Sequence, residues 1–127
     1  MTRKSFSVRI FLQDGCADGV KIVSRSKWSG RGLVIPRSAL AAELDRAELK
    51  DPGVYLLSAP AAAADRPSFC IGAADPVCDG LARCCADEQG WSTAIIFTCK
   101  EDRLSYAQCR FIVERLLQLA RSADITP

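Results

Sequence analysis

The sequence predicts an α+β protein in which a core of three strands and two helices is preceded by a β-rich N-terminal extension. Three observations support this class. Short runs of alternating or β-branched apolar residues, typical of strands, recur along the chain. Two segments in the second half instead carry apolar residues at helical spacing. Over residues 51–121 these signals follow the order strand, strand, helix, strand, helix.

Length and composition suit one domain over residues 1–127. We expect residues 1–50 to form the extension with one helix, residues 51–121 the core, and residues 122–127 a tail. Hydrophobic residues make up 49% of the chain, which is enough for a packed core. No apolar run is long enough to span a membrane, and the N-terminus alternates apolar with polar residues, unlike a signal peptide. The expected location is therefore cytoplasmic.

The extension is predicted to hold three strands, over residues 6–12, Val20–Ser24 and Leu33–Ile35. Trp28–Gly32 is rich in glycine and predicts a tight turn before the third strand. Pro36 ends that strand. Ser38 is a favourable N-cap residue and predicts a helix over about Ala39–Arg46.

The core is predicted to begin with a hairpin, since two apolar runs flank a loop bracketed by prolines. Ser105 and Gln108 match a capping box, which predicts the start of the longest helix. The predicted core elements are a strand over Val54–Ala59, a returning strand at Phe69–Gly72, a helix opened by Asp75 and Pro76, a strand over Ser92–Lys100 and a helix from Ser105 to about Arg121.

Residues 52–121 resemble the GIY-YIG nuclease superfamily. Gly53-Val54-Tyr55 matches the first motif and Ile71-Gly72 matches the end of the second. Trp91 before the third strand and the last helix, "DRLSYAQCRFIVERLLQLA", also fit, and the extension resembles the leader of bacterial stand-alone members. The resemblance implies a small antiparallel sheet between helices and hydrolysis of DNA phosphodiesters.

The resemblance also implies a set of catalytic roles. Tyrosines position or activate the nucleophilic water, an arginine stabilises charge on the phosphate, and a glutamate holds a divalent metal. The first-motif tyrosine is present as Tyr55, and the second motif keeps its glycine as Gly72. The second tyrosine falls on Cys70, the arginine on Gly80, a further tyrosine or histidine on Cys84, and the metal-binding glutamate on Val113.

Nearly every group that would perform chemistry is therefore replaced. An acid–base group contributes about 10²–10⁴ in rate, and a charge-stabilising donor about 10²–10³. The leading hypothesis is a catalytically impaired nuclease-fold protein that binds nucleic acid or acts as a regulatory module. One alternative is an active DNA endonuclease with a rearranged site that uses Tyr55 and Arg83 and requires Mg²⁺ or Mn²⁺. Another is a protein-interaction domain that does not bind nucleic acid.

Charge is unevenly distributed along the chain. The net charge is +2, but residues 1–37 hold eight basic and two acidic residues and so carry +6. Such a segment can contact phosphates, and an exposed indole can stack on a base. The candidate nucleic-acid-binding residues are Arg25, Lys27, Trp28 and Arg31. The alternative is that these charges form the solvated face of a small sheet.

The seven cysteines do not predict a zinc site, since the chain has no CxxC pair and no histidine. Free cysteines are commonly small buried hydrophobic residues in a reducing compartment. If the resemblance holds, Cys70 and Cys84 converge on one pocket. They would then form a soft-metal half-site, a redox pair or simple packing. No metal ligand and no cofactor are predicted.

Overall fold

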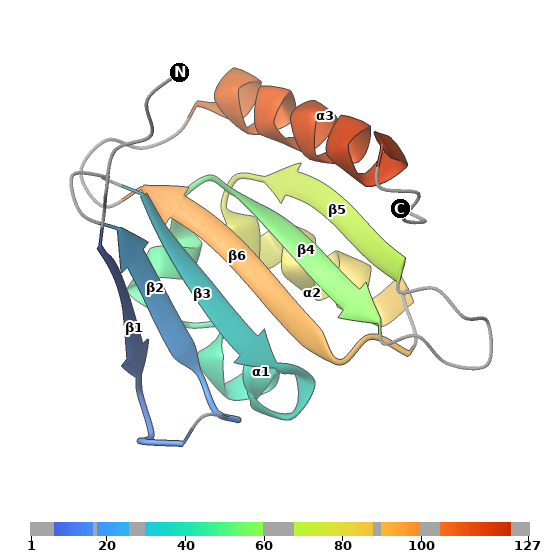
Figure 1. The fold of residues 1–127 in the computed structure, drawn as a ribbon. Coiled ribbons are helices and arrows are strands. Elements are labelled where there is room, and N and C mark those ends of the chain that lie inside the picture. Colours follow the sequence, from blue (N-terminus) through green and yellow to red (C-terminus); the bar gives the residue numbers. More distant parts are fainter. Residues whose placement is uncertain are drawn as a thin grey trace.

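The computed structural model describes residues 7–16, 18–25, 30–59, 68–87, 90–99 and 105–122. Within them it is a mixed α+β structure built on one six-stranded antiparallel sheet with strand order β1-β2-β3-β6-β4-β5 (Figure 1). The strands are β1 Val8–Leu12, β2 Lys21–Arg25, β3 Gly30–Pro36, β4 Gly53–Ala59, β5 Ser68–Ala74 and β6 Thr93–Cys99. The helices are α1 Arg37–Glu43, the short 3₁₀ helix η1 Ala47–Lys50, α2 Val77–Asp87 and α3 Tyr106–Ser122.

The predicted α+β class and the element order of the core are confirmed. The three core strands lie together as β6-β4-β5, but they form half of a larger sheet. Strand β3 of the extension pairs along its whole length with β6, from Gly30 opposite Cys99 to Pro36 opposite Thr93. The pairing of β3 with β6 therefore joins the extension and the core into one sheet.

The predicted capping box at the start of α3 is confirmed. The backbone N–H of Ser105 donates to Oε1 of Gln108 at 2.8 Å. In return, the backbone N–H of Gln108 donates to Oγ of Ser105 at 3.1 Å. Two backbone donors that lack a partner within the helix are thereby satisfied, which fixes where α3 begins.

The prediction that Ser38 caps the first helix is wrong. Helix α1 begins at Arg37, its N-cap residue is Pro36, and no side chain caps it. The start is held by the segment just before β6 instead, because the backbone N–H of Arg37 donates to the carbonyl of Ser92 at 2.9 Å. The Arg37 guanidinium also donates to the Trp91 carbonyl at 3.1 Å and stacks 5.0 Å from the Trp91 ring. Tertiary contacts therefore replace the local cap.

The predicted turn at Trp28–Gly32 is also revised. Gly30 to Gly32 belong to β3, where Gly32 lies opposite Phe97 of β6. A Cβ atom at this position would meet the Phe97 ring at 3.5 Å, an ordinary contact distance, so packing does not require glycine here. Trp28 and Lys27 lie outside the described residues.

The sheet is covered on both faces, as the doubly apolar sequence of β4 predicts. Helices α1 and α2 and the η1 turn lie on one face and α3 lies on the other (Figure 1). The larger core, on the α1–α2 face, includes Leu33, Ile35, Leu49, Leu57, Val77, Leu81, Trp91 and Ile96. The smaller core, beneath α3, is built from Val54, Cys109 and Val113, with Leu56, Ile71 and Ile112 packed against them.

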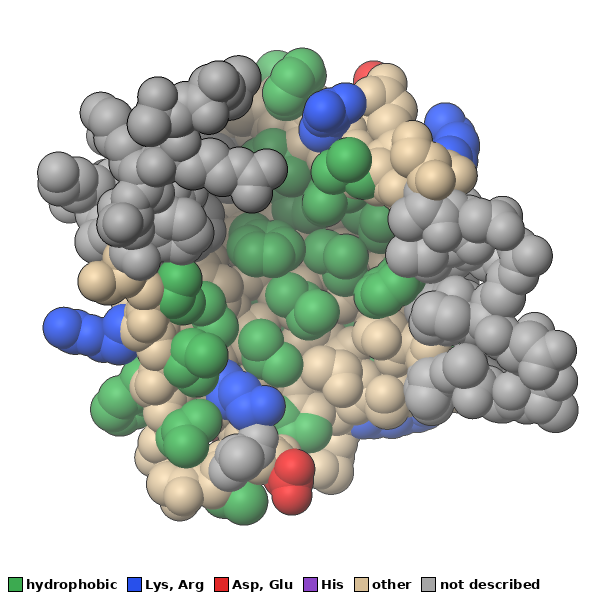
Figure 2. Space-filling model, in the orientation of Figure 1, with side chains coloured by type: hydrophobic (Ala, Val, Ile, Leu, Met, Phe, Trp, Pro, Cys, Tyr) green, Lys and Arg blue, Asp and Glu red, His purple; other side chains and the backbone are tan. Residues whose placement is uncertain are grey.

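Helix α3 covers only part of its face of the sheet. Figure 2 shows hydrophobic side chains gathered on the open part of this face, below α3. Among the helices in the described part of the chain, none is both long and apolar enough to cross a bilayer.

Candidate functional site

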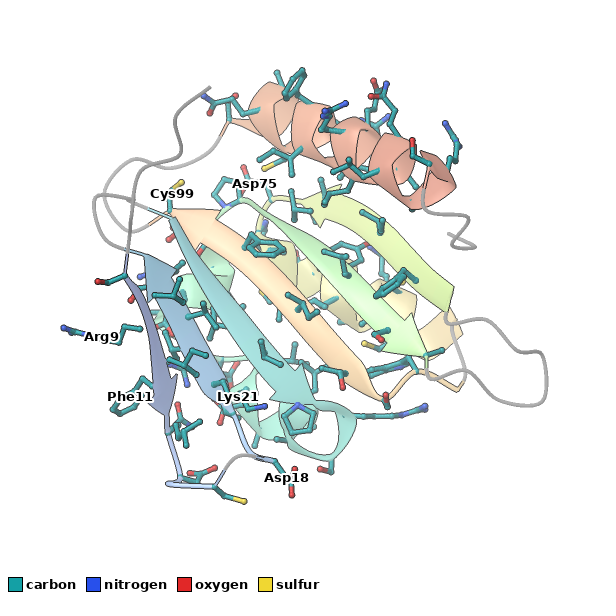
Figure 3. The ribbon with its side chains drawn as sticks, viewed as in Figure 1. Arg9, Phe11, Asp18, Lys21, Asp75 and Cys99 are labelled. Carbon is teal, nitrogen blue, oxygen red and sulfur yellow. The ribbon has the colours of Figure 1, made fainter. Side chains whose placement is uncertain are left out.

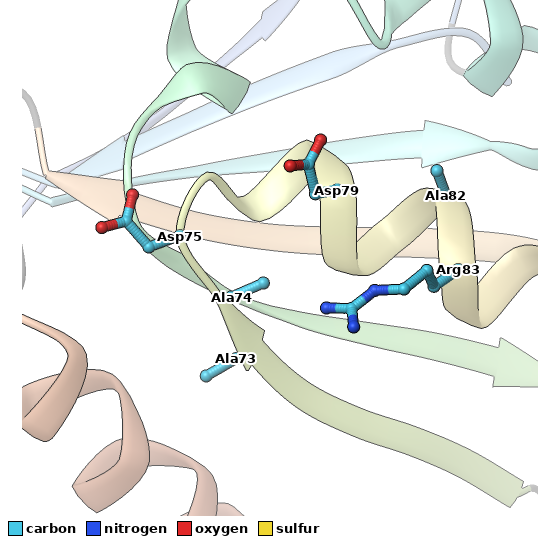
Figure 4. A pocket seen from close by; sticks show the side chains of 6 residues that line it. All are labelled: Ala73, Ala74, Asp75, Asp79, Ala82 and Arg83. Atoms are coloured by element: carbon cyan, nitrogen blue, oxygen red, sulfur yellow. The ribbon is translucent and has the colours of Figure 1, made fainter.

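An open cleft of about 690 Å³ lies where β5 ends and α2 begins. This is where the family resemblance would place an active site. Figure 4 shows Arg83 extending from α2 toward Ala74 at the end of β5, with Asp75 in the turn between the two elements. The lining residues are Ala73, Ala74, Asp75, Asp79, Ala82 and Arg83.

Tyr55 fills the space beside this cleft and is held between two glycines. It lies opposite Gly72 in the β4–β5 pairing. A Cβ atom on Gly72 would lie 2.5 Å from Cζ of the Tyr55 ring, and one on Gly80 would lie 2.9 Å from its Cε1. The same Gly80 Cβ would also lie 2.5 Å from Cβ of Ala74. Glycine is therefore required at position 80, where the implied catalytic arginine has no room, and a side chain at position 72 would force the Tyr55 ring to move.

Cys70 on β5 and Cys84 on α2 meet beside Tyr55. Their Sγ atoms are 3.1 Å apart, and both cysteines are half-buried and reduced. A disulfide bond would need a separation of about 2.05 Å. The structure thus brings together the two positions where the resemblance implies polar rings, and fills them with thiols in contact. Among the described residues, no group of three or more acidic, histidine or cysteine residues could hold a metal ion.

The chemistry of Tyr55 follows from this packing. Burial, together with the neighbouring Cys84 and Cys70, raises the pKa of Tyr55 to about 12, while Arg83 acts in the opposite direction. The hydroxyl is therefore protonated at neutral pH. A general base works best with a pKa near the working pH. Tyr55 can donate a hydrogen bond, but it is a poor group to activate water.

The position implied for the metal-binding glutamate lies in an apolar core. Val113 on α3 is only 6% exposed and packs in the cluster with Val54 and Cys109. Its neighbour Glu114 is exposed, since consecutive helical residues point about 100° apart. Neither side chain therefore places a carboxylate beside Tyr55.

Among the residues that the structure describes, Arg83 is the one cationic side chain lining the cleft. It is exposed, and it forms no hydrogen bond or ion pair with another residue that the structure describes. Two carboxylates, those of Asp75 and Asp79, line the same cleft. The cleft can thus offer one guanidinium to an anion, with acidic groups close by.

Asp75 and Asp79 were not predicted as site residues. The spacing of Asp79 and Arg83 could have indicated them, because residues four apart on α2 lie on one side of the helix, and Asp75 lies just before the helix begins. The resemblance implies the arginine at position 80 instead.

The structure describes only some of the predicted nucleic-acid-binding residues. Arg25 ends β2, and its side chain lies outside the described part of the chain. Arg31 is on β3, where its Nε donates to Oγ1 of Thr98 at 2.9 Å and its Nη2 lies 3.6 Å from a carboxylate oxygen of Asp51. The Arg31 guanidinium is therefore already engaged by Thr98 and Asp51 within the protein. The roles of Arg25, Lys27, Trp28 and Arg31 stay predictions.

Comparison with protein-family models, with curated proteins and with solved structures finds no significant match to this chain.

Proposed function

We propose that this protein is a catalytically impaired GIY-YIG-like module that binds nucleic acid without hydrolysing it. The observation that carries the proposal is the packing around Tyr55. The positions where the resemblance implies three polar side chains are occupied by Cys70, Gly80 and Cys84. The two thiols contact each other, and Gly80 lies against the Tyr55 ring. Packing contacts thus stand where a hydrolytic site would need polar groups.

Hydrolysis of a phosphodiester needs an activated water and stabilisation of the developing charge. Tyr55 is protonated at neutral pH, as an ordinary tyrosine is, and burial raises its pKa further, to about 12. Val113 supplies no ligand for a metal that would polarise the phosphate. Arg83 alone can bind a phosphate, but binding substrate and transition state equally does not accelerate the reaction. Binding without turnover is therefore the function that this arrangement favours.

Phosphate binding is supported by charge. Arg83 projects into an open cleft, and residues 1–37 carry a net charge of +6. Asp75 and Asp79 oppose an anion in the cleft. We therefore expect weak binding that depends strongly on salt, because it comes from a few phosphate contacts.

The test is fluorescence anisotropy of labelled single- and double-stranded DNA, titrated with protein over a range of salt concentrations. We expect Arg83→Gln to weaken binding and to lower the slope of log affinity against log salt by about one. Arg121→Gln, at the exposed far end of α3, is the matched control and should leave both quantities unchanged. The proposal fails if neither DNA binds at low salt, or if the two variants weaken binding equally.

The alternative of a protein-interaction domain is favoured by a different observation. Six large apolar side chains are exposed among the described residues, and four of them lie on β1. A monomeric protein rarely leaves such a strand uncovered. Nucleic-acid binding and protein contact would use different surfaces, because the cleft lies beside β5 at the opposite edge of the sheet.

A further inference from the structure

Strand β1 is an edge strand whose apolar side chains are exposed among the described residues. It is the outermost strand of the sheet, and no described strand pairs with its outer side. Natural edge strands are usually blocked by lysine, proline or a bulge, since an open edge invites pairing with another chain. Here the exposed fractions are 53% for Val8, 57% for Ile10, 56% for Phe11 and 37% for Leu12.

The hydrogen-bonding groups at this edge can be assigned. Just beyond β1, the backbone N–H of Gln13 donates to the Val20 carbonyl of the neighbouring chain segment at 3.1 Å. In an antiparallel ladder, alternate residues direct both backbone groups toward the same side. The residues that direct their N–H and C=O groups away from β2 are therefore Val8, Ile10 and Leu12. Among these, the Leu12 carbonyl accepts a hydrogen bond from Gly15 at 3.0 Å.

We propose that β1 pairs antiparallel with β1 of a second copy of this chain, about a two-fold axis that passes beside Ile10. The Ile10 N–H of each copy then donates to the Ile10 carbonyl of the other. The Leu12 N–H of each copy donates to the Val8 carbonyl of the other. This register is the one that centres the pairing on an outward-facing residue in the middle of the strand, and it uses none of the carbonyls already occupied.

The side chains identify the occupant as a second copy, because the strand is complementary to itself in this register. On one face, Val8 lies opposite Leu12 and Ile10 opposite Ile10, so that only apolar groups meet. On the other face, Arg9 lies opposite Phe11, and no two like charges face each other. Opposed apolar pairs and a cation beside an aromatic ring stabilise cross-strand contacts. Figure 3 shows Arg9 and Phe11 projecting from β1 at this edge.

The pairing also joins apolar surface that is continuous across the sheet. Ile10 lies opposite Val23, Val23 opposite Gly32, and Gly32 opposite Phe97. These residues run across the face that α3 leaves partly open (Figure 2). A two-fold pairing at β1 places this row beside its copy in one twelve-stranded sheet, given six strands in each chain. The interface is isologous, so it closes as a dimer and does not propagate as a fibre.

The test uses two substitutions at one position. Phe11→Glu places a carboxylate opposite Arg9 of the second copy, whereas Phe11→Lys places a like charge there. We expect a dimer for the wild type and for Phe11→Glu by sedimentation equilibrium, and a dissociation constant at least about tenfold higher for Phe11→Lys. Phe11 is exposed, so both variants should keep the wild-type circular dichroism spectrum and melting temperature apart from the dimer contribution.

Leu119→Lys is the matched control, because Leu119 is 50% exposed on α3 and lies away from β1. It should leave the dimer unchanged. A monomeric wild type at every concentration would overturn the proposal. Equal dissociation by Phe11→Glu and Phe11→Lys would also overturn it, since that result would mean that simple loss of apolar surface, and not this register, governs association.

Discussion

Gly80→Ala is expected to lower the free energy of unfolding by about 2 kcal/mol, although the same change at an ordinary helical position raises it by up to about 1 kcal/mol. The reason is steric. The new Cβ would lie 2.5 Å from Cβ of Ala74 and 2.9 Å from Cε1 of Tyr55. Cβ of Ala74 is fixed to the backbone of β5 and cannot rotate away, so α2 must shift from the sheet. Chemical denaturation monitored by circular dichroism measures the change.

Gly32→Ala is the control for this prediction. Its Cβ would meet the Phe97 ring at 3.5 Å, which is ordinary contact distance. We expect little change or a small gain in stability, because glycine in a strand is entropically costly. Adding Ala74→Gly to Gly80→Ala should recover part of the loss, since it removes the nearest clashing atom. A Gly80→Ala protein as stable as the wild type would contradict the described packing.

The same clash also affects the catalytic arginine that the resemblance implies at position 80. The Cβ atom of an arginine at position 80 would clash with Ala74 and Tyr55 as alanine does, and its long charged side chain would need further space there. Restoring the implied catalytic arginine therefore requires rearrangement of α2, and Gly80→Arg should cost more stability than Gly80→Ala.

Val113→Glu is the second change with a large expected effect. It restores the glutamate that the resemblance implies, but the side chain enters the cluster with Val54 and Cys109. A buried carboxylate without a partner is strongly unfavourable. At neutral pH we expect a loss of about 3 kcal/mol or more in the free energy of unfolding.

The pH dependence of Val113→Glu gives a sharper test. Burial disfavours the charged form, so the pKa of the introduced glutamate is higher in the folded state than its unfolded value of about 4.3. The electrostatic penalty is therefore absent below that value and grows as the pH rises toward the folded pKa. The measurement is the difference in unfolding free energy between variant and wild type at several pH values. Leu119→Glu, at a half-exposed position on the same helix, should show little difference at any pH. A Val113→Glu penalty that is small and independent of pH would contradict the buried placement of this residue.

Much of the fold could be predicted because its signals are local. Alternating apolar residues mark β1, helical spacing marks α3, and Ser105 with Gln108 marks the start of that helix. These patterns depend on neighbouring residues along the chain, so they can be recognised before any tertiary contact is known. The start of α1 could not be predicted in this way, because the Arg37 contacts with Trp91 and Ser92 replace the local Ser38 cap.

Long-range pairing was less predictable. The strands of the extension could be recognised, but their junction with β6 pairs residues far apart in the chain, such as Gly30 and Cys99. Nothing in the local sequence of β3 identifies β6 as its pairing partner. The result is a six-stranded sheet in which β1, and not a core strand, forms one edge.

The candidate site was predicted in part for a similar reason. Helical spacing places Gly80 and Cys84 on one face, and the resemblance implies that Cys70 converges on the same pocket. The structure brings the two thiols to 3.1 Å. The reason for glycine at positions 72 and 80 is the close approach of the Tyr55 ring, a tertiary contact with no local signature. The acidic character that Asp79 gives the cleft was not predicted, because the resemblance implies no functional group at position 79.

The central claim is that the site beside Tyr55 does not hydrolyse phosphodiesters. The most direct measurement is nicking of supercoiled plasmid by the purified wild type in Mg²⁺ and in Mn²⁺, beside Tyr55→Phe and Arg83→Ala. We predict that the wild type cleaves no faster than either variant in both metals. Metal-dependent nicking by the wild type that Tyr55→Phe or Arg83→Ala abolishes would contradict the claim and establish a rearranged but active site.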